Sequence, residues 1–358
     1  MATNSLSRVE QFVEGFTDDY FWIGMDVHKR SYHIALLRAD GKSLTLVSPA
    51  SPQSVVKLIN CLAIPVATVA YESGPTGFTL ARELNAAGIP VMVVAPSRVP
   101  RAITVGAKTD RLDCLKLAAY AAKGLLHSIA IPSPEEEAHR SLIRRRHDVA
   151  ASVRRCKQHI KSLLLFLGVE EPTELEHWAQ GAEELLHALP MEASAKHTLE
   201  SHLRELKFYR QELKDVDSQL HQLAKQQAHR KTIACLKSVP GVGPVVATTF
   251  LCELFRPERF ARAEEVASYL GLAPMVRHSG EKTPSGRLVP VGQTKLRSLL
   301  VEAAWMWRAK DDYARNLYNR FLSRMGIAQK AISALARKLA IILWRLCIEK
   351  RPYRTVTL

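Results

Sequence analysis

Four acidic residues of the chain could together form a metal site for phosphodiester chemistry. Asp26 and Glu72 each close a short apolar run, and Asp110 and Asp113 lie three residues apart further on. That spacing puts Asp110 and Asp113 on one face of a helix start, where the helix dipole favours negative charge. Carboxylate oxygens suit Mg²⁺ or Mn²⁺, and two such ions can activate a nucleophile and stabilise a leaving oxygen. The residues leave a second interpretation open, in which Asp110 only caps a helix and Glu72 lies on the surface.

A cation-rich segment near residue 280 could supply a nucleophile. Ser279 precedes Gly280, and the cations around it are Arg277, Lys282 and Arg287, followed by Lys295 and Arg297. A serine hydroxyl can attack phosphorus while cations offset the charge of the transition state. Ser-Gly is also a common turn, and Ser285 is a rival for the same role.

The segment VPGVGP, residues 239–244, lies between two predicted helices. Gly241 and Gly243 would free backbone N–H groups for a phosphate, as in a helix-hairpin-helix element. A tight helix-helix turn without a ligand fits the same residues.

The charge balance favours a nucleic-acid partner. The chain of 358 residues carries 50 Lys and Arg against 35 Asp and Glu, a net charge of +15. Positive charge gathers on a predicted helix that includes Arg144, Arg145, Arg154 and Arg155, and we expect these residues to contact nucleic acid. A solvated helix face is the simpler alternative.

Other classes of protein fit the composition less well. The six cysteines form no CxxC pair, which argues against a zinc finger or disulfide framework and favours a cytoplasmic protein. No apolar stretch reaches the roughly 18 residues of a membrane span.

The elements that must position these residues follow from the hydrophobic pattern. Apolar runs predict strands at 21–27, 31–38, 43–48, 66–72 and 91–94, with helices at 52–62, 76–87 and 108–126. The sequence therefore predicts an α/β domain at residues 21–130, after a flexible leader at 1–20. Two long amphipathic helices within 135–230 predict an antiparallel coiled-coil arm, with ordinary bundle helices as the alternative. Residues 232–358 form a helical C-terminal domain, with helices predicted at 293–309, 311–324 and 327–349.

Several motifs together resemble one family of mobile-element proteins. They are GMDVHK (24–29), YESGPTG (71–77), KTDRLDCLKLA (108–118), PGVGP (240–244), GLAP (271–274) and RHSGEKTPSGR (277–287). In this order they resemble the DEDD-type insertion-sequence transposases, family one-hundred-and-ten in insertion-sequence nomenclature, which are described as bridge-RNA-guided recombinases.

The resemblance implies a fold and a site. The first domain would be RNase H/RuvC-like, with Mg²⁺ (or Mn²⁺) on Asp26, Glu72, Asp110 and Asp113. Ser279 in the C-terminal transposase domain would attack a DNA phosphodiester and form a covalent phosphoserine intermediate. This chain departs from the family after Gly286-Arg287, where Leu288-Val-Pro-Val-Gly292 replaces a segment that usually carries a lysine.

The resemblance also implies partners. They would be a bridge RNA, donor and target DNA, and further copies of the chain as dimers and a tetramer, in a bacterial cytoplasm at the nucleoid. The alternative is a metal-dependent structure-specific nuclease of Holliday-junction resolvase type, in which Ser279 is only structural. A non-enzymatic nucleic-acid-binding protein is third, because it leaves the four acids without a role.

Overall fold

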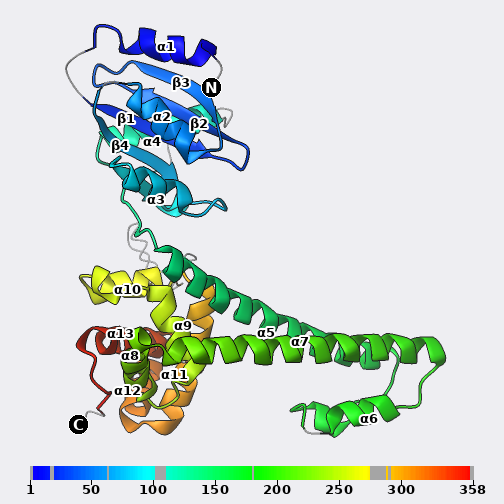
Figure 1. Ribbon diagram of the computed structural model, residues 1–358. Coiled ribbons are helices and arrows are strands. Elements are labelled where there is room, and N and C mark those ends of the chain that lie inside the picture. Colours follow the sequence, from blue (N-terminus) through cyan, green and yellow to red (C-terminus); the bar gives the residue numbers. More distant parts are fainter. Residues whose placement is uncertain are drawn as a thin grey trace. The chain divides into compact units, whose positions relative to one another are not determined.

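The computed structural model describes residues 3–16, 20–62, 64–100, 110–179, 181–274, 288 and 292–354. The chain divides into two compact units, residues 1–133 and residues 134–358 (Figure 1). Each unit has its own hydrophobic core.

The first unit is built on a five-stranded mixed sheet with the order β3-β2-β1-β4-β5. The first three strands form an antiparallel meander, and β4 and β5 run parallel to β1. The strands are β1 (Phe21–Val27), β2 (Ser31–Leu37), β3 (Ser43–Pro49), β4 (Val66–Glu72) and β5 (Val91–Val94). The helices are α2 (Pro52–Asn60), α3 (Thr79–Ala86) and α4 (Asp110–Ala122), with a 3₁₀ turn η1 (Pro96–Arg98). The predicted α/β class and the predicted strands are confirmed, and the arrangement is consistent with an RNase H/RuvC-like domain.

The two faces of the sheet differ because side chains alternate along each strand. Phe21, Ile23 and Met25 of β1 point into the larger core, together with residues of α2 and α3. The opposite face carries small residues in register on three neighbouring strands, with Gly24 opposite both Ala35 and Ala70. Helix α4 packs on this second face, through Cys114 and Ala118.

Residues 3–13 form helix α1 (Thr3–Val13), where the sequence pattern had predicted a flexible leader. Val9 is buried in the larger core, and Phe12 packs against the same cluster. The guanidinium of Arg38 lies 4.0 Å from the ring centroid of Phe16 and donates a hydrogen bond to the Phe12 carbonyl. These apolar and cation–π contacts stabilise the segment against the larger core.

The second unit begins with two long helices that lie side by side, α5 (Pro134–Phe166) and α7 (Ala193–Lys225) (Figure 1). They are joined through η2 (Thr173–Leu175) and α6 (Ala182–Ala188). The buried residues of α5 include Val149, Cys156 and Ile160. Nearer the start of the helix, Ile143 is buried in a cluster with Cys252 of the helical region that follows, and Leu142 is only partly buried.

The remaining helices surround one hydrophobic core. They are α8 (Gln227–Lys237), α9 (Pro244–Leu254), η3 (Pro257–Arg259), α10 (Ala263–Tyr269), α11 (Thr294–Lys310), α12 (Asp312–Met325) and α13 (Ala328–Glu349). The last three agree with the predicted ranges to within one residue at each end. Trp307, the largest fully buried side chain, lies in this core. Among the described residues, no helix is long and apolar enough to cross a membrane.

Candidate active site

Asp26 lies near the end of β1 on the face that α4 covers. Its strand neighbour Met25 points into the opposite core and is fully buried, whereas Asp26 is about a quarter exposed. In the parallel pairing with β4, Met25 lies opposite Tyr71, so Glu72 follows on the neighbouring strand on the same face as Asp26. The sheet therefore brings two of the four predicted acids to one edge.

Helix α4 reaches this edge because Gly24 has no side chain. A Cβ atom at Gly24 would lie 1.9 Å from the carbonyl oxygen of Cys114 and 2.5 Å from the amide nitrogen of Ala118. Only glycine permits so close an approach of helix backbone to strand backbone. The contact fixes the first turns of α4 above β1, two residues before Asp26.

A third acid, Asp113, lies in the first turn of α4. Asp113 directly precedes Cys114 in α4. The pKa of the Cys114 thiol is raised to about 11, chiefly by burial and in smaller part by the Asp26 and Asp113 carboxylates. Asp26 of the strand and Asp113 of the helix therefore both act electrostatically on the same thiol.

Asp110 is the first residue of α4, but its side chain lies outside the described part of the structure. Among the described residues, no three His, Cys, Asp or Glu side chains are grouped closely enough to hold a metal ion. The predicted ligands Asp26, Glu72 and Asp113 carry carboxylate oxygens, which hard divalent ions prefer. The chemistry of the donor set thus fits Mg²⁺ or Mn²⁺.

Two histidines beside Asp26 were not singled out by the sequence reasoning. Nε2 of His28 lies 3.2 Å from Oδ2 of Asp26, and His33 is the cross-strand partner of Asp26 on β2. The two imidazole rings are 5.9 Å apart and meet edge to face. The signal was present, since His28 lies two residues after Asp26 and a short hairpin pairs Asp26 with His33.

The predicted nucleophile, Ser279, lies outside the described residues, as do its rival Ser285 and the cations Arg277, Lys282 and Arg287. The structure does describe the base of this segment. A Cβ atom at Gly292, whose φ is +101°, would lie 2.6 Å from the amide nitrogen of Gly271. Arg297 of α11 donates a hydrogen bond of 3.1 Å to the Gly271 carbonyl.

A second pair of contacts closes the same base. Pro274 and Leu288 form an isolated antiparallel bridge, and the amide of Gln293 donates to the Tyr269 carbonyl at 3.2 Å. The described residues on either side of the Ser279 segment are therefore joined by backbone contacts.

Gly241 has a packing role in the turn between α8 and α9. Its φ is +87°, and a Cβ atom there would lie 2.8 Å from both the Met306 Cβ and the Trp307 amide nitrogen of α11. This close approach explains Gly241 without a ligand. Gly243, at the N-cap of α9, has open space where a Cβ would point. Its contact with nucleic acid stays a prediction.

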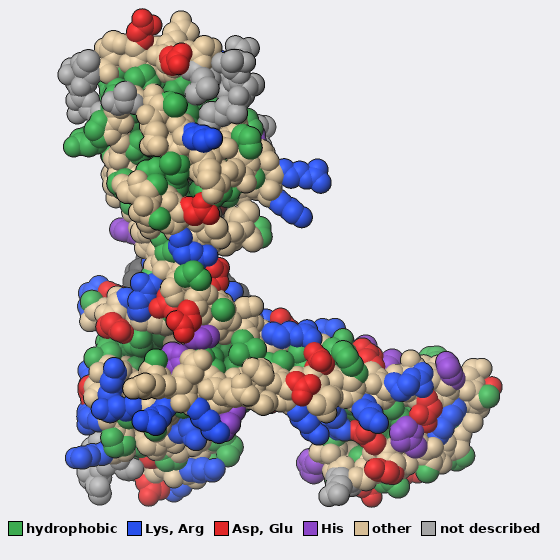
Figure 2. Space-filling model, viewed as in Figure 1, with side chains coloured by type: hydrophobic (Ala, Val, Ile, Leu, Met, Phe, Trp, Pro, Cys, Tyr) green, Lys and Arg blue, Asp and Glu red, His purple; other side chains and the backbone are tan. Residues whose placement is uncertain are grey.

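The arginines of α5 fall into two groups. Arg144 and Arg145 pair with acids of the same unit, Arg144 with Glu253 at 3.4 Å and Arg145 with Glu212 at 3.1 Å. Arg154 and Arg155 are exposed, and no acid within the described ranges pairs with either. Figure 2 shows Lys and Arg side chains over the helices of this unit with Asp and Glu between them, so part of the basic run is neutralised within the protein.

Comparison with known proteins gives two matches to family models. A model described as the transposase IS116/IS110/IS902 family matches residues 233–319, and a model of DEDD-type IS110 transposases matches residues 23–168. Together they cover more than half of the chain. The second match contains all four acids, and the first contains Ser279 and the VPGVGP turn.

Curated relatives agree with these matches. A putative transposase y4qE of Sinorhizobium fredii is 28% identical over 75% of this chain, and the match covers 64% of that relative's length. The transposase for insertion sequence element IS1533 of Leptospira borgpetersenii is 26% identical, covering 80% of this chain and 85% of its own. The transposase for insertion sequence element IS1111A of Coxiella burnetii is 24% identical over 75% of this chain and 74% of its own.

Proposed function

The chain belongs to the IS116/IS110/IS902 family of transposases, which are enzymes that cut and rejoin DNA, and on that premise we propose how its residues divide the work. Asp26, Glu72, Asp110 and Asp113 hold divalent metal, and Ser279 attacks a DNA phosphodiester. The observation that carries this proposal is that Asp26 and Glu72 lie on the same face of the neighbouring strands β1 and β4, and that α4, which carries Asp113, packs on that face.

The acids would hold Mg²⁺ or Mn²⁺. When bound, the metal supplies a Lewis acid that stabilises the charge on phosphate and leaving oxygen. The chain's own part is to fix the ligands, which it does through the close contact of Gly24 with α4. His28, 3.2 Å from Asp26, would hold that carboxylate in one orientation.

Ser279 would form a covalent phosphoserine link to one DNA end, releasing the oxygen of the other end, and a DNA hydroxyl would later reverse the step. The fixed base formed by Gly271, Gly292 and Arg297 supports this role, because a nucleophile must return to one position in each cycle.

The partners would be a bridge RNA together with donor and target DNA. The net charge of +15 and the exposed Arg154 and Arg155 support binding to nucleic-acid backbones. The packed pair α5 and α7 would act as a coiled-coil arm between copies of the chain, assembled as dimers and a tetramer.

A strand-transfer assay tests the proposal. The purified full-length protein is incubated with element-end DNA, target DNA, the non-coding RNA transcribed beside the gene, and Mg²⁺. We expect Asp26→Asn, Asp113→Asn and Ser279→Ala each to abolish joined product while leaving DNA binding in place. Joined product at the wild-type level from Asp26→Asn or Asp113→Asn would refute the metal site.

A structure-specific nuclease is the second candidate, because the acids lie in a compact unit that does not contain Ser279. In that case Ser279→Ala cuts branched DNA as fast as the wild type, and Asp26→Asn does not cut it.

A further inference from the structure

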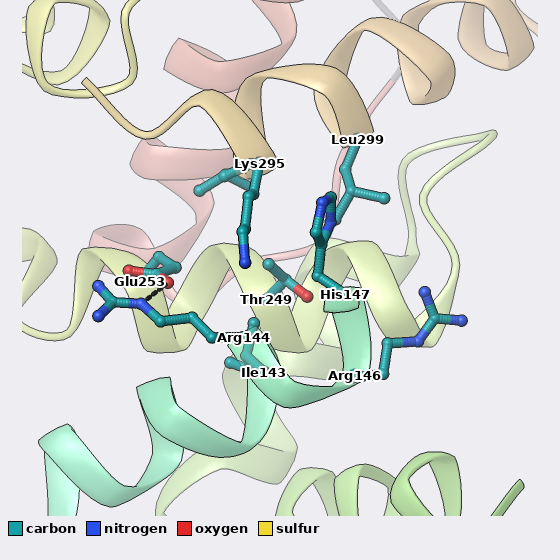
Figure 3. Close-up of a pocket in the computed structure, with 9 residues that line it drawn as sticks. Ile143, Arg144, Arg146, His147, Thr249, Glu253, Lys295 and Leu299 are labelled. Carbon is teal, nitrogen blue, oxygen red and sulfur yellow. Dashed lines mark hydrogen bonds and ion pairs between the residues drawn. The ribbon is translucent and has the colours of Figure 1, made fainter. Parts of the chain in front are cut away.

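A small cavity lies in the second unit between α5, α9 and α11. Its volume is about 20 Å³, the room of one water molecule or one phosphate oxygen. In Figure 3 Lys295 from α11, His147 from α5 and Thr249 from α9 converge on this space. Each side chain can donate a hydrogen bond to an oxygen.

The other charged side chains around the cavity are turned toward partners. Arg146 points away from it and pairs with Asp217 at 2.9 Å. Glu253, the acid in the lining, is buried and already accepts from Arg140 at 3.0 Å and from Arg144 at 3.4 Å. The one acid in the cavity wall is therefore satisfied by two arginines.

The pKa of the His147 imidazole shows how burial and nearby charged groups act at the cavity. Burial lowers the pKa of its imidazole, and Lys295, Arg154 and Arg146 lower it further, against the opposing effect of Asp148. The cations thus outweigh Asp148 at the imidazole. An anion at the cavity mouth would relieve this excess.

The cavity lies beside the base of the Ser279 segment. Lys295 is in the first turn of α11, three residues after Gly292, and Arg297 of the same helix holds the Gly271 carbonyl. The described chain resumes as a continuous stretch after the Ser279 segment at Gly292, three residues before Lys295.

We propose that this cavity binds a backbone phosphate of the DNA strand on which Ser279 acts, with one phosphate oxygen entering between Lys295, His147 and Thr249. The inference rests on the proposed DNA strand transfer. Asp148 pairs with Lys295 in the free protein and competes with the phosphate for it. Basic side chains follow further along α5, where Arg154 lies ten residues after Arg144, a rise of about 15 Å or roughly four base-pair steps of DNA.

The test is the salt dependence of DNA binding, measured by fluorescence anisotropy on the full-length protein carrying Ser279→Ala, so that no chemistry is needed. The probes are a labelled DNA duplex and a labelled RNA hairpin of equal length. Lys295→Gln removes the proposed contact. Lys310→Gln is its matched control, an exposed lysine at the other end of the same helix.

We expect Lys295→Gln to weaken duplex binding about threefold to tenfold at about 0.15 M salt and to reduce the slope of log K against log salt by about one. Lys310→Gln should leave the slope unchanged. Asp148→Asn should tighten DNA binding, because it releases Lys295, and misfolding would not produce this opposite sign.

Equal effects of Lys295→Gln and Lys310→Gln would overturn the proposal, as would an effect on the RNA hairpin alone. Weaker binding by Asp148→Asn would also overturn it. If the strand-transfer assay fails while these salt slopes hold, the proposed chemistry falls and the phosphate site stands.

Discussion

The contact between Gly24 and α4 gives the sharpest prediction about how the acidic edge is held. In Gly24→Ala the new Cβ would lie 1.9 Å from the Cys114 carbonyl oxygen, and ordinary contact begins near 3.4 Å. Because both partners are backbone atoms of regular elements, no side-chain rotation relieves the clash, and α4 must move by about 1.5 Å.

The magnitude follows from two opposing effects. Overpacking in a core costs about 1–3 kcal/mol of stability, and because both contacts here are with rigid backbone we take the upper value of about 3 kcal/mol. Alanine regains about 0.5–1 kcal/mol over glycine within a strand. We therefore expect a net loss of about 2 kcal/mol, and roughly a hundredfold loss of strand transfer as Asp113 moves away from Asp26.

Hydrogen exchange read by mass spectrometry localises the effect. Peptides from α4 should exchange about thirtyfold faster in Gly24→Ala than in the wild type, with α13 unchanged. Gly74→Ala is the matched control, since the nearest atom to its Cβ is 4.0 Å away and it should leave α4 as it is. Unchanged α4 exchange in Gly24→Ala would refute the close-packing argument.

Three further predictions concern stability and the serine segment. The pKa of Cys114 in the folded protein is about 11 against an ordinary value of 9.0, so the stability that its neutral thiol contributes is complete below about pH 9 and is lost as the pH rises toward 11. Chemical denaturation across this pH window should show a smaller fall in the free energy of unfolding for Cys114→Ala than for the wild type. Arg140→Met should lower the free energy of unfolding by about 3–5 kcal/mol, because it leaves Glu253 buried and poorly paired. The double variant Arg140→Met with Glu253→Met should lose less stability, and equal losses of stability in urea denaturation would contradict the buried pair. Gly292→Ala should lose strand transfer but keep DNA binding by gel shift, because a Cβ at φ +101° would push apart the base of the Ser279 segment; full activity would show that the base does not position the serine.

The elements were largely predictable because their signals are local. Apolar runs such as the one that ends at Asp26 predicted the strands of the sheet, and helical periodicity predicted α11 to α13. Helix α1 was missed although its apolar residues, Leu6, Val9, Phe12 and Val13, recur at the three- and four-residue spacing of a helix.

The site was predictable in its residue types but not in its geometry. The likeness to known motifs named Asp26, Glu72, Asp110 and Asp113, but the close packing of α4 on the sheet depends on the register of Gly24 with Ala35 and Ala70. That register joins β1 to its hairpin partner β2 and to β4, which follows only after β3 and α2.

Long-range ion pairs were also invisible in the sequence. Arg144 and Glu253 are 109 residues apart, so a run of arginines that suggested nucleic-acid contact proved to be partly neutralised inside the protein. The number of charged residues in a sequence does not show which of them pair with each other in the fold.

The most direct test of the central claim is to map the covalent protein–DNA bond. The wild-type protein is stopped in mid-reaction on nicked element-end DNA with Mg²⁺, digested, and the peptide that carries the nucleotide is sequenced by mass spectrometry. The account predicts an adduct on Ser279 that disappears in Ser279→Ala and in Asp26→Asn. An adduct on Ser285, or undiminished strand transfer by Ser279→Ala, would contradict it.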